Sequence, residues 1–409
     1  MVPIRCTLGL NALNLFTAAV QTGFGPFFSV YLTEQGWSQV DIGFALSIGT
    51  ASVLLLQLPA GGLVDMIHHK RFAIGLALLL IGVSALMLVA TPTQGPVWAA
   101  QVMHAIGSCI MTPAIAALTL ALCGHAGFSE RLGINARYAS IGDALAAALL
   151  GALAYYISNR AVFIAAMLLV LPALATLPLF RISDSVDEND HPALLHPKKR
   201  RSRNHRPWQI YREPAFHVFT AAAVLFQFAN AAMLPLALNE LTKRTGHSGF
   251  VVSAAIIVPQ IVVALFSPLV GRVAQSVGRR PLLLLGFAAL PLRALLFVSL
   301  PAAVPLVAMQ VLDGVSGVVF GLMIPLIAAD LTRRTGFLNF AINSLALAGG
   351  LGATLSTTSA GWIADTMGAP AAFLGLALIG LLALLVIGTL MPETRPDKSL
   401  RLPPAVAAA

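Results

Sequence analysis

Apolar stretches of about 20 residues recur along the whole chain and are separated by short polar segments. Each stretch has the length of an α-helix that crosses a hydrocarbon core of about 30 Å. The apolar positions are continuous and do not alternate, so the pattern predicts helices and not the strands of a β-barrel. The twelve predicted spans are 8–32, 40–64, 72–91, 97–121, 134–157, 161–180, 215–239, 249–274, 281–300, 305–330, 338–362 and 370–391.

Composition supports an all-α polytopic membrane protein. Of the 409 residues, 58% are hydrophobic and only 10% are charged, too few charges to cover a soluble chain of this length. Three cysteines exclude a disulfide scaffold. There is no phosphate-binding glycine-rich loop of the ATPase type and no Cys/His cluster with zinc spacing. We therefore predict no enzyme activity, no cofactor and no metal.

The positive charges predict how the chain is inserted. If twelve spans start and end in the cytoplasm, 21 of the 25 Lys and Arg residues lie inside, and only Arg160, Lys243 and Arg244 lie outside. This is a strong positive-inside bias, so both termini are predicted to be cytoplasmic in a bacterial-type inner membrane. The net charge of +9 then records insertion and does not indicate a nucleic-acid partner. The first apolar run is too long for a cleaved signal peptide, which predicts an uncleaved first helix.

The chain also contains an internal repeat. The segment 61–71 recurs at 271–281, an offset of 210, and the turn 92–96 recurs at 301–305. A common offset over several spans predicts two six-helix halves of the same topology, related by an axis along the membrane normal. The predicted units are 1–180, a charged cytoplasmic linker at 181–214, and 215–409 with its short cytoplasmic tail.

The linker carries an acidic run followed by a basic run at 198–206. Its low hydrophobicity and blocks of like charge predict a mobile loop. The basic run is interpreted as a topology determinant on the inner leaflet of the bilayer, and binding of nucleic acid or anionic lipid is the alternative.

The repeated segment resembles the signature of the major facilitator superfamily, Gly-x-Leu-Ala-Asp-Arg-x-Gly-Arg-Arg/Lys. The matching residues are Gly61, Asp65, Lys70 and Arg71 in the first copy, and Gly271, Gln275, Gly278, Arg279 and Arg280 in the second. The resemblance implies twelve helices in two bundles and transport by alternating access. It also implies that this loop latches the halves together at the cytoplasmic face.

Both copies depart from the signature. The first has Met66 for the arginine and His68-His69 for Gly-Arg, and the second has Gln275 for the aspartate. Asp65 is predicted to act beside a helix N-terminus, where negative charge is favoured. The second copy lacks that acid, so its latch is predicted to be weaker.

Four ionisable side chains stand out within the predicted spans, where an unpaired charge is costly: His104, Asp143, Arg293 and Asp313. His104, Asp143 and Asp313 are the candidates for proton coupling. Each also has a structural alternative: a packing histidine for His104, a helix-to-helix hydrogen bond for Asp143, and a buried ion pair with Arg293 for Asp313. Arg293 and Asp313 lie at matching depths, each eight residues from an outer turn, which predicts the ion pair.

The resemblance implies that spans 1, 4, 7 and 10 line a central cavity. The polar residues on these spans are Asn14, Gln21, Gln101, His104, Gln227, Asn230, Gln310 and Asp313. They predict a substrate with polar and apolar parts.

We therefore expect a monomeric, proton-coupled secondary transporter of a small organic solute, with the lipid bilayer as its surroundings. The alternatives are a drug or metabolite efflux antiporter, an importer of a nutrient or siderophore-like compound, and a non-transporting membrane sensor. Span 5 lacks the prolines usual in drug antiporters.

Overall fold

The computed structural model describes residues 4–24, 26–67, 69–180, 206–238, 249–299, 303–333 and 335–395. Within these ranges the chain forms helices and no strands. They are α1 (Ile4–Thr22), α2 (Pro26–Glu34), α3 (Gln39–Met66), α4 (Lys70–Ala90), α5 (Gln94–Tyr156), α6 (Asn159–Ala175), η1 (Leu177–Leu179), η2 (Pro207–Arg212), α9 (Pro214–Ala231), α11 (Gly249–Ser276), α12 (Arg280–Ser299), α13 (Ala303–Thr332), α14 (Leu338–Met367) and α15 (Ala369–Leu390).

Ten of the described helical segments are long and apolar enough to cross a membrane. One of them, the 63-residue α5, covers both the fourth and fifth predicted spans. The first predicted span corresponds to α1 and α2, which are not among the ten: α2 has only nine residues, and α1, with 19, is interspersed with polar residues. The all-α membrane fold is confirmed, and the total of twelve crossings stays a prediction.

Helix α5 folds back on itself at Gly124. A straight helix of 63 residues would be about 95 Å long, about three times the hydrocarbon core. Gly124 adopts φ 62°, a left-handed conformation that glycine tolerates best. Asn135 Nδ2 donates to Thr119 Oγ1 at 2.8 Å, so the two arms, 94–123 and 125–156, lie side by side. The segment 122–133 between the fourth and fifth predicted spans is therefore helical apart from Gly124.

Prolines interrupt two helices at equivalent places. Helix α1 ends at Thr22 and α2 begins at Pro26, while α9 ends at Ala231 and a short helical turn containing Pro235 follows. A proline has no N–H to donate to the carbonyl four residues before it, which here belongs to Thr22 or Ala231. Pro26 and Pro235 are 209 residues apart, the offset of the repeat.

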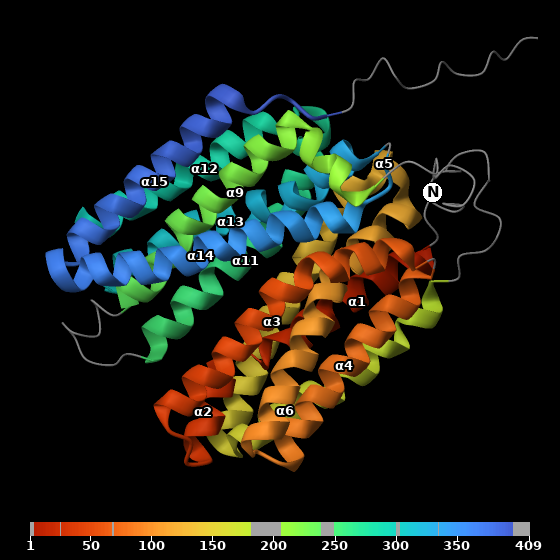
Figure 1. The fold of residues 1–409 in the computed structure, drawn as a ribbon, viewed down its shortest axis with the longest axis vertical. Helices are drawn as coiled ribbons and strands as arrows, with labels where there is room; N and C mark the ends of the chain where they lie inside the picture. Colours follow the sequence, from red (N-terminus) through yellow and green to blue (C-terminus); the bar gives the residue numbers. More distant parts are fainter. Residues whose placement is uncertain are drawn as a thin grey trace, which may run out of the picture.

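The helices form two bundles that meet at one end (Figure 1). Helices α1–α6 make one bundle and α9–α15 make the other, and both splay apart away from the N-terminus. We call the meeting end, which contains the 66–70 and 276–280 turns, the closed end.

Part of the predicted linker is packed. Residues 181–205 lie outside the described residues, but η2 begins at Pro207. Ile210 is buried, and the hydroxyls of Tyr211 and Ser344 share a hydrogen bond of 3.0 Å. The end of the predicted mobile loop is thus held against the second bundle.

Candidate functional site

The first contact between the bundles, the first seam, joins α3 to the start of α14. A Cβ on Gly61 would lie 2.6 Å from the Asn339 backbone oxygen, so only glycine allows this approach. Asp65 accepts hydrogen bonds from the Asn339 amide at 3.1 Å, the Asn339 Nδ2 at 2.6 Å and the Phe340 amide at 2.9 Å. A helix start has unpaired N–H groups and a positive dipole end, so a carboxylate fits there.

The second seam joins the second arm of α5 to α11. A Cβ on Gly271 would lie 2.6 Å from the Ser129 backbone oxygen, and Ser129 Oγ donates to the Gly271 oxygen at 2.6 Å. Gln275, in the place equivalent to Asp65, donates its side-chain amide to the Ala126 backbone oxygen. At these positions the second seam is thus held by neutral groups.

Equivalent residues also meet at both seams one helical turn farther from the closed end. In the first, Asn343 Nδ2 donates to the Gln57 oxygen at 2.6 Å. In the second, the equivalent residue is Gly133, whose added Cβ would meet the Ser267 oxygen at 2.3 Å. The equivalent residues Gly61 and Gly271, Asp65 and Gln275, and Gly133 and Asn343 are each 210 positions apart. The repeat therefore places equivalent residues at both seams, while their side-chain chemistry differs.

The Asp65→Ala variant will open the closed end more readily than Gln275→Ala. The first loses hydrogen bonds to a carboxylate, worth about 1.5–3 kcal/mol, and the second loses a neutral bond, worth about 0.5–1.5 kcal/mol. The reporter is Ala116→Cys in a background without native cysteines, because Ala116 is 5% exposed in an apolar cluster that both bundles share. Maleimide labelling at this site should be faster in Asp65→Ala, and equal rates in the two variants would contradict the assignment.

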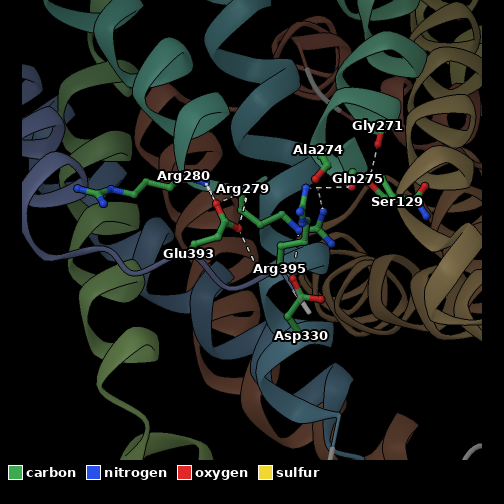
Figure 2. A network of polar contacts seen from close by, with 9 residues as sticks. All are labelled: Ser129, Gly271, Ala274, Gln275, Arg279, Arg280, Asp330, Glu393 and Arg395. Carbon is green, nitrogen blue, oxygen red and sulfur yellow. Dashed lines mark hydrogen bonds and ion pairs between the residues drawn. The ribbon is translucent and has the colours of Figure 1, made fainter. Parts of the chain in front are cut away.

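The second motif copy also anchors α11, α12 and α13 to the segment after α15 (Figure 2). Arg279 Nε lies 3.1 Å from Asp330 Oδ2. Glu393 accepts the backbone N–H of Arg279 at 2.9 Å and of Arg280 at 3.1 Å. Burial raises the pKa of the Glu393 carboxyl, but these backbone donors lower it further, to below its usual value. Gly278 adopts φ 125°, and a Cβ there would lie 2.4 Å from Glu393 Oε2.

The corresponding turn of the first motif copy lies between α3 and α4. Lys70 Nζ donates to the Val64 oxygen at 2.5 Å, and Arg71 follows it in the first turn of α4. His69 precedes α4, while His68 lies outside the described residues.

In the second bundle, three predicted site residues form one cluster beside the interruption of α9. Arg293 on α12 is 1% exposed and its Nη1 pairs with Asp313 Oδ1 on α13. The same Nη1 donates to Asn230 Oδ1 on α9 at 3.0 Å. The Asp313 side chain is 22% exposed, so the acid lies at the surface of the cluster and the guanidinium lies behind it.

In the first bundle, polar side chains lie beside the end of α1. Asp143 on α5 accepts a hydrogen bond of 2.9 Å from the Thr22 hydroxyl. His104 stacks on Phe24 with ring centroids 4.1 Å apart, and its Nε2 is buried with no partner among the described residues. No described hydrogen bond joins His104 to Asp143 or Asp313.

The other predicted polar residues differ in burial. Asn14 is 8% exposed and its amide donates to the Leu10 oxygen of its own helix, while Gln101 is buried beside Gly49. Gln310 is fully buried and donates to the Leu306 oxygen at 3.3 Å. Gln21 and Gln227 are half-buried.

A buried arginine on the second arm of α5 was not predicted as a site residue. Arg131 is 6% exposed and donates to Asn135 Oδ1 at 2.9 Å and to Asn11 Oδ1 at 2.5 Å. From the sequence, Arg131 was expected among the cytoplasmic cations between the fourth and fifth spans. The i, i+4 spacing of Arg131 and Asn135 is the signal that would have put both in a helix. Arg137, one turn beyond Gly133, donates across the second seam to the Ala264 oxygen at 2.9 Å.

Comparison with known proteins gives consistent results. The family model described as Major Facilitator Superfamily matches residues 10–236 and 219–406. An uncharacterised MFS-type transporter of Mycobacterium tuberculosis, found in two strains, is 34% identical and covers 96% of this chain and 94% of its own length.

Three solved structures share the fold at 14% identity. The E. coli fucose:proton symporter FucP has a TM-score of 0.71 and covers 94% of this chain and 98% of its own. The proton:xylose symporter XylE has a TM-score of 0.71 and covers 96% and 95%. The human organic anion transporter MFSD10 has a TM-score of 0.69 and covers 94% and 100%.

Proposed function

Because the chain belongs to the major facilitator superfamily and is a multi-pass membrane transporter, we propose that it moves a small organic solute by proton-coupled alternating access. The observation that carries the coupling is the Arg293–Asp313 pair, a buried cation behind a partly exposed acid. FucP and XylE, two proteins of the same fold, are proton symporters, which agrees with the proposal.

Alternating access is supported by the one-sided contact between the bundles. The described hydrogen bonds between them belong to the two seams, and the bundles splay apart beyond the seams (Figure 1). The positive charges of the chain assign the closed end to the cytoplasm. On this assignment the molecule is outward-facing, in a bacterial-type inner membrane, and both seams separate in the inward-facing state.

Coupling works through the neutralisation of Asp313. With the acid charged, Arg293 is paired with it and with Asn230. A proton that reaches Asp313 from the exposed side removes the charge that compensates Arg293. The guanidinium then keeps only Asn230 and has donors free for an acceptor on the solute. Release of the proton restores the pair and weakens solute binding.

A thermal-shift screen of a metabolite library should identify the solute, because a ligand that binds the folded state raises its apparent stability. The hit is then tested in proteoliposomes with and without an imposed proton gradient. We expect accumulation above equilibrium only with the gradient, and vesicle orientation will report import or export. Equal final accumulation without a gradient would rule out coupling.

The Asp313→Asn variant separates coupling from structure. The carboxamide keeps an oxygen that accepts from Arg293, so we expect a folded protein that still exchanges solute but has lost its pH dependence. Uptake as a function of external pH and size-exclusion chromatography are the two measurements. A variant that does not fold would indicate a purely structural ion pair.

A further inference from the structure

α-Helical hydrogen bonding changes at the end of α1, inside the first bundle. The Phe24 amide donates to the Gln21 oxygen at 3.1 Å, the bond of a tightened last turn, where a continuous α-helix would use the Val20 oxygen. Pro26 has no N–H for the Thr22 oxygen. The last carbonyls of a helix carry its negative dipole end, which favours a cation.

Asp143 brings a carboxylate to this helix end. It follows Gly142, where an added Cβ would lie 2.1 Å from the Leu15 oxygen, so α5 can approach the α1 backbone. The Thr22 hydroxyl, which also lies 3.1 Å from the Ala18 oxygen, donates to Asp143 Oδ1 at 2.9 Å. No other described residue bonds to this carboxylate, so its second oxygen is left for a ligand.

The second bundle lacks this arrangement. Position 353, equivalent to Asp143 by the offset of 210, is an alanine, and α9 ends at Ala231 where α1 ends at Thr22. The same helix interruption therefore exists in both halves. In the second half an alanine stands at the position of Asp143, and the acid beside α9, Asp313, is paired with Arg293.

The geometry points to a sodium site formed by Asp143, the Thr22 hydroxyl and the freed carbonyl oxygens at the end of α1. Hard monovalent cations prefer such oxygen ligands, and interrupted transporter helices supply them. A single carboxylate is too little charge for Ca²⁺ or Mg²⁺, which take several. Within the described ranges, no three His, Cys, Asp or Glu side chains form a metal-binding group.

The surrounding packing favours a small ion. A Cβ on Gly23 would lie 3.0 Å from Ala166 Cβ and 3.5 Å from Leu150 Cδ1, so the helix end is enclosed by apolar side chains. A proton on Asp143 would satisfy one acceptor, whereas a sodium ion binds several oxygens together. The site goes beyond the proton coupling proposed above, since Asp143 is not in contact with the Arg293 cluster.

Binding of radioactive ²²Na⁺ to the purified full-length protein in detergent at pH 8 tests this site without any solute. We expect saturable binding that unlabelled Na⁺ displaces and choline does not. Asp143→Asn should lose saturable binding, and Thr22→Val should weaken it by about tenfold. Thr17→Val is the matched control, since its hydroxyl bonds only to backbone oxygens of α1, and it should bind like the unmodified protein.

Three outcomes would overturn the sodium site. They are no saturable binding in the unmodified protein, binding that survives Asp143→Asn, and equal losses in Thr22→Val and Thr17→Val. Thermal stability in choline chloride verifies that each variant is folded. If Asp143→Asn does not fold, the Thr22→Val and Thr17→Val pair decides. Asp313→Asn should bind sodium normally, so failure of proton coupling and failure of the sodium site are read separately.

Discussion

The Gly133→Val variant will lose most transport activity because the second seam cannot close. The new Cβ would lie 2.3 Å from the Ser267 oxygen and 2.9 Å from the Pro268 Cα, both backbone atoms that cannot turn away. Overpacking of this kind costs about 1–3 kcal/mol, which shifts the closed end toward opening by about 5- to 150-fold. Labelling of Ala116→Cys should rise accordingly while solute uptake falls.

Gly151→Val is the control for that experiment. Gly151 lies on the same arm of α5, and no atom is within 4 Å of its added Cβ. Gly151→Val therefore replaces a helical glycine by valine, as Gly133→Val does, but it leaves the contact between α5 and α11 unaffected. Uptake close to that of the unmodified protein is expected. Equal losses in the two variants would mean that the effect belongs to the helix and not to the seam.

Of the two single variants of the buried pair, Asp313→Leu will lose more stability than Arg293→Met. Without the acid, Arg293 stays charged at 1% exposure with only Asn230 as acceptor. Removing one partner of a buried pair costs about 3–5 kcal/mol. In Arg293→Met the remaining acid is 22% exposed and can be neutralised by a proton, so we expect a smaller loss. Thermal unfolding in detergent measures both.

The double variant Arg293→Met/Asp313→Leu should recover most of the lost stability, since apolar replacement of a buried pair is often neutral. It should still lack proton-driven uptake. Recovery of stability together with loss of coupling separates the two roles of the pair. A double variant as unstable as Asp313→Leu alone would show that the cluster is required for packing.

Hydropathy predicted the helices well because burial in lipid depends only on local composition. Each described helix of the second bundle begins within about two residues of its predicted span. The reversal between the fourth and fifth spans was predicted, but its tightness at Gly124 was not, because a single left-handed glycine does not change hydropathy. For the same reason, Arg131 was not predicted to lie within a helix.

The candidate site was only partly predictable. The Arg293–Asp313 pair follows from equal depth on neighbouring antiparallel helices, and the structure contains it. Asn14 and Gln310 share a face with other polar residues but are buried, because helical periodicity does not identify which neighbour covers a face. The seams depend on residues more than 100 positions apart. The signature motif and Asp65 predicted a contact with a helix start, but the partner residues on α14 and α11 could not be identified from the sequence.

The folded-back α5 connects the second seam to the interior of the first bundle. One arm carries His104 in the interior and the other carries Gly133 at the second seam. The Asn135–Thr119 hydrogen bond fastens the arms to each other, and Arg131 fastens the second arm to Asn11 of α1. A displacement of the seam is therefore transmitted through the two joined arms to the interior. We expect spans 4 and 5 to move together, so that a displacement of one arm also displaces the other.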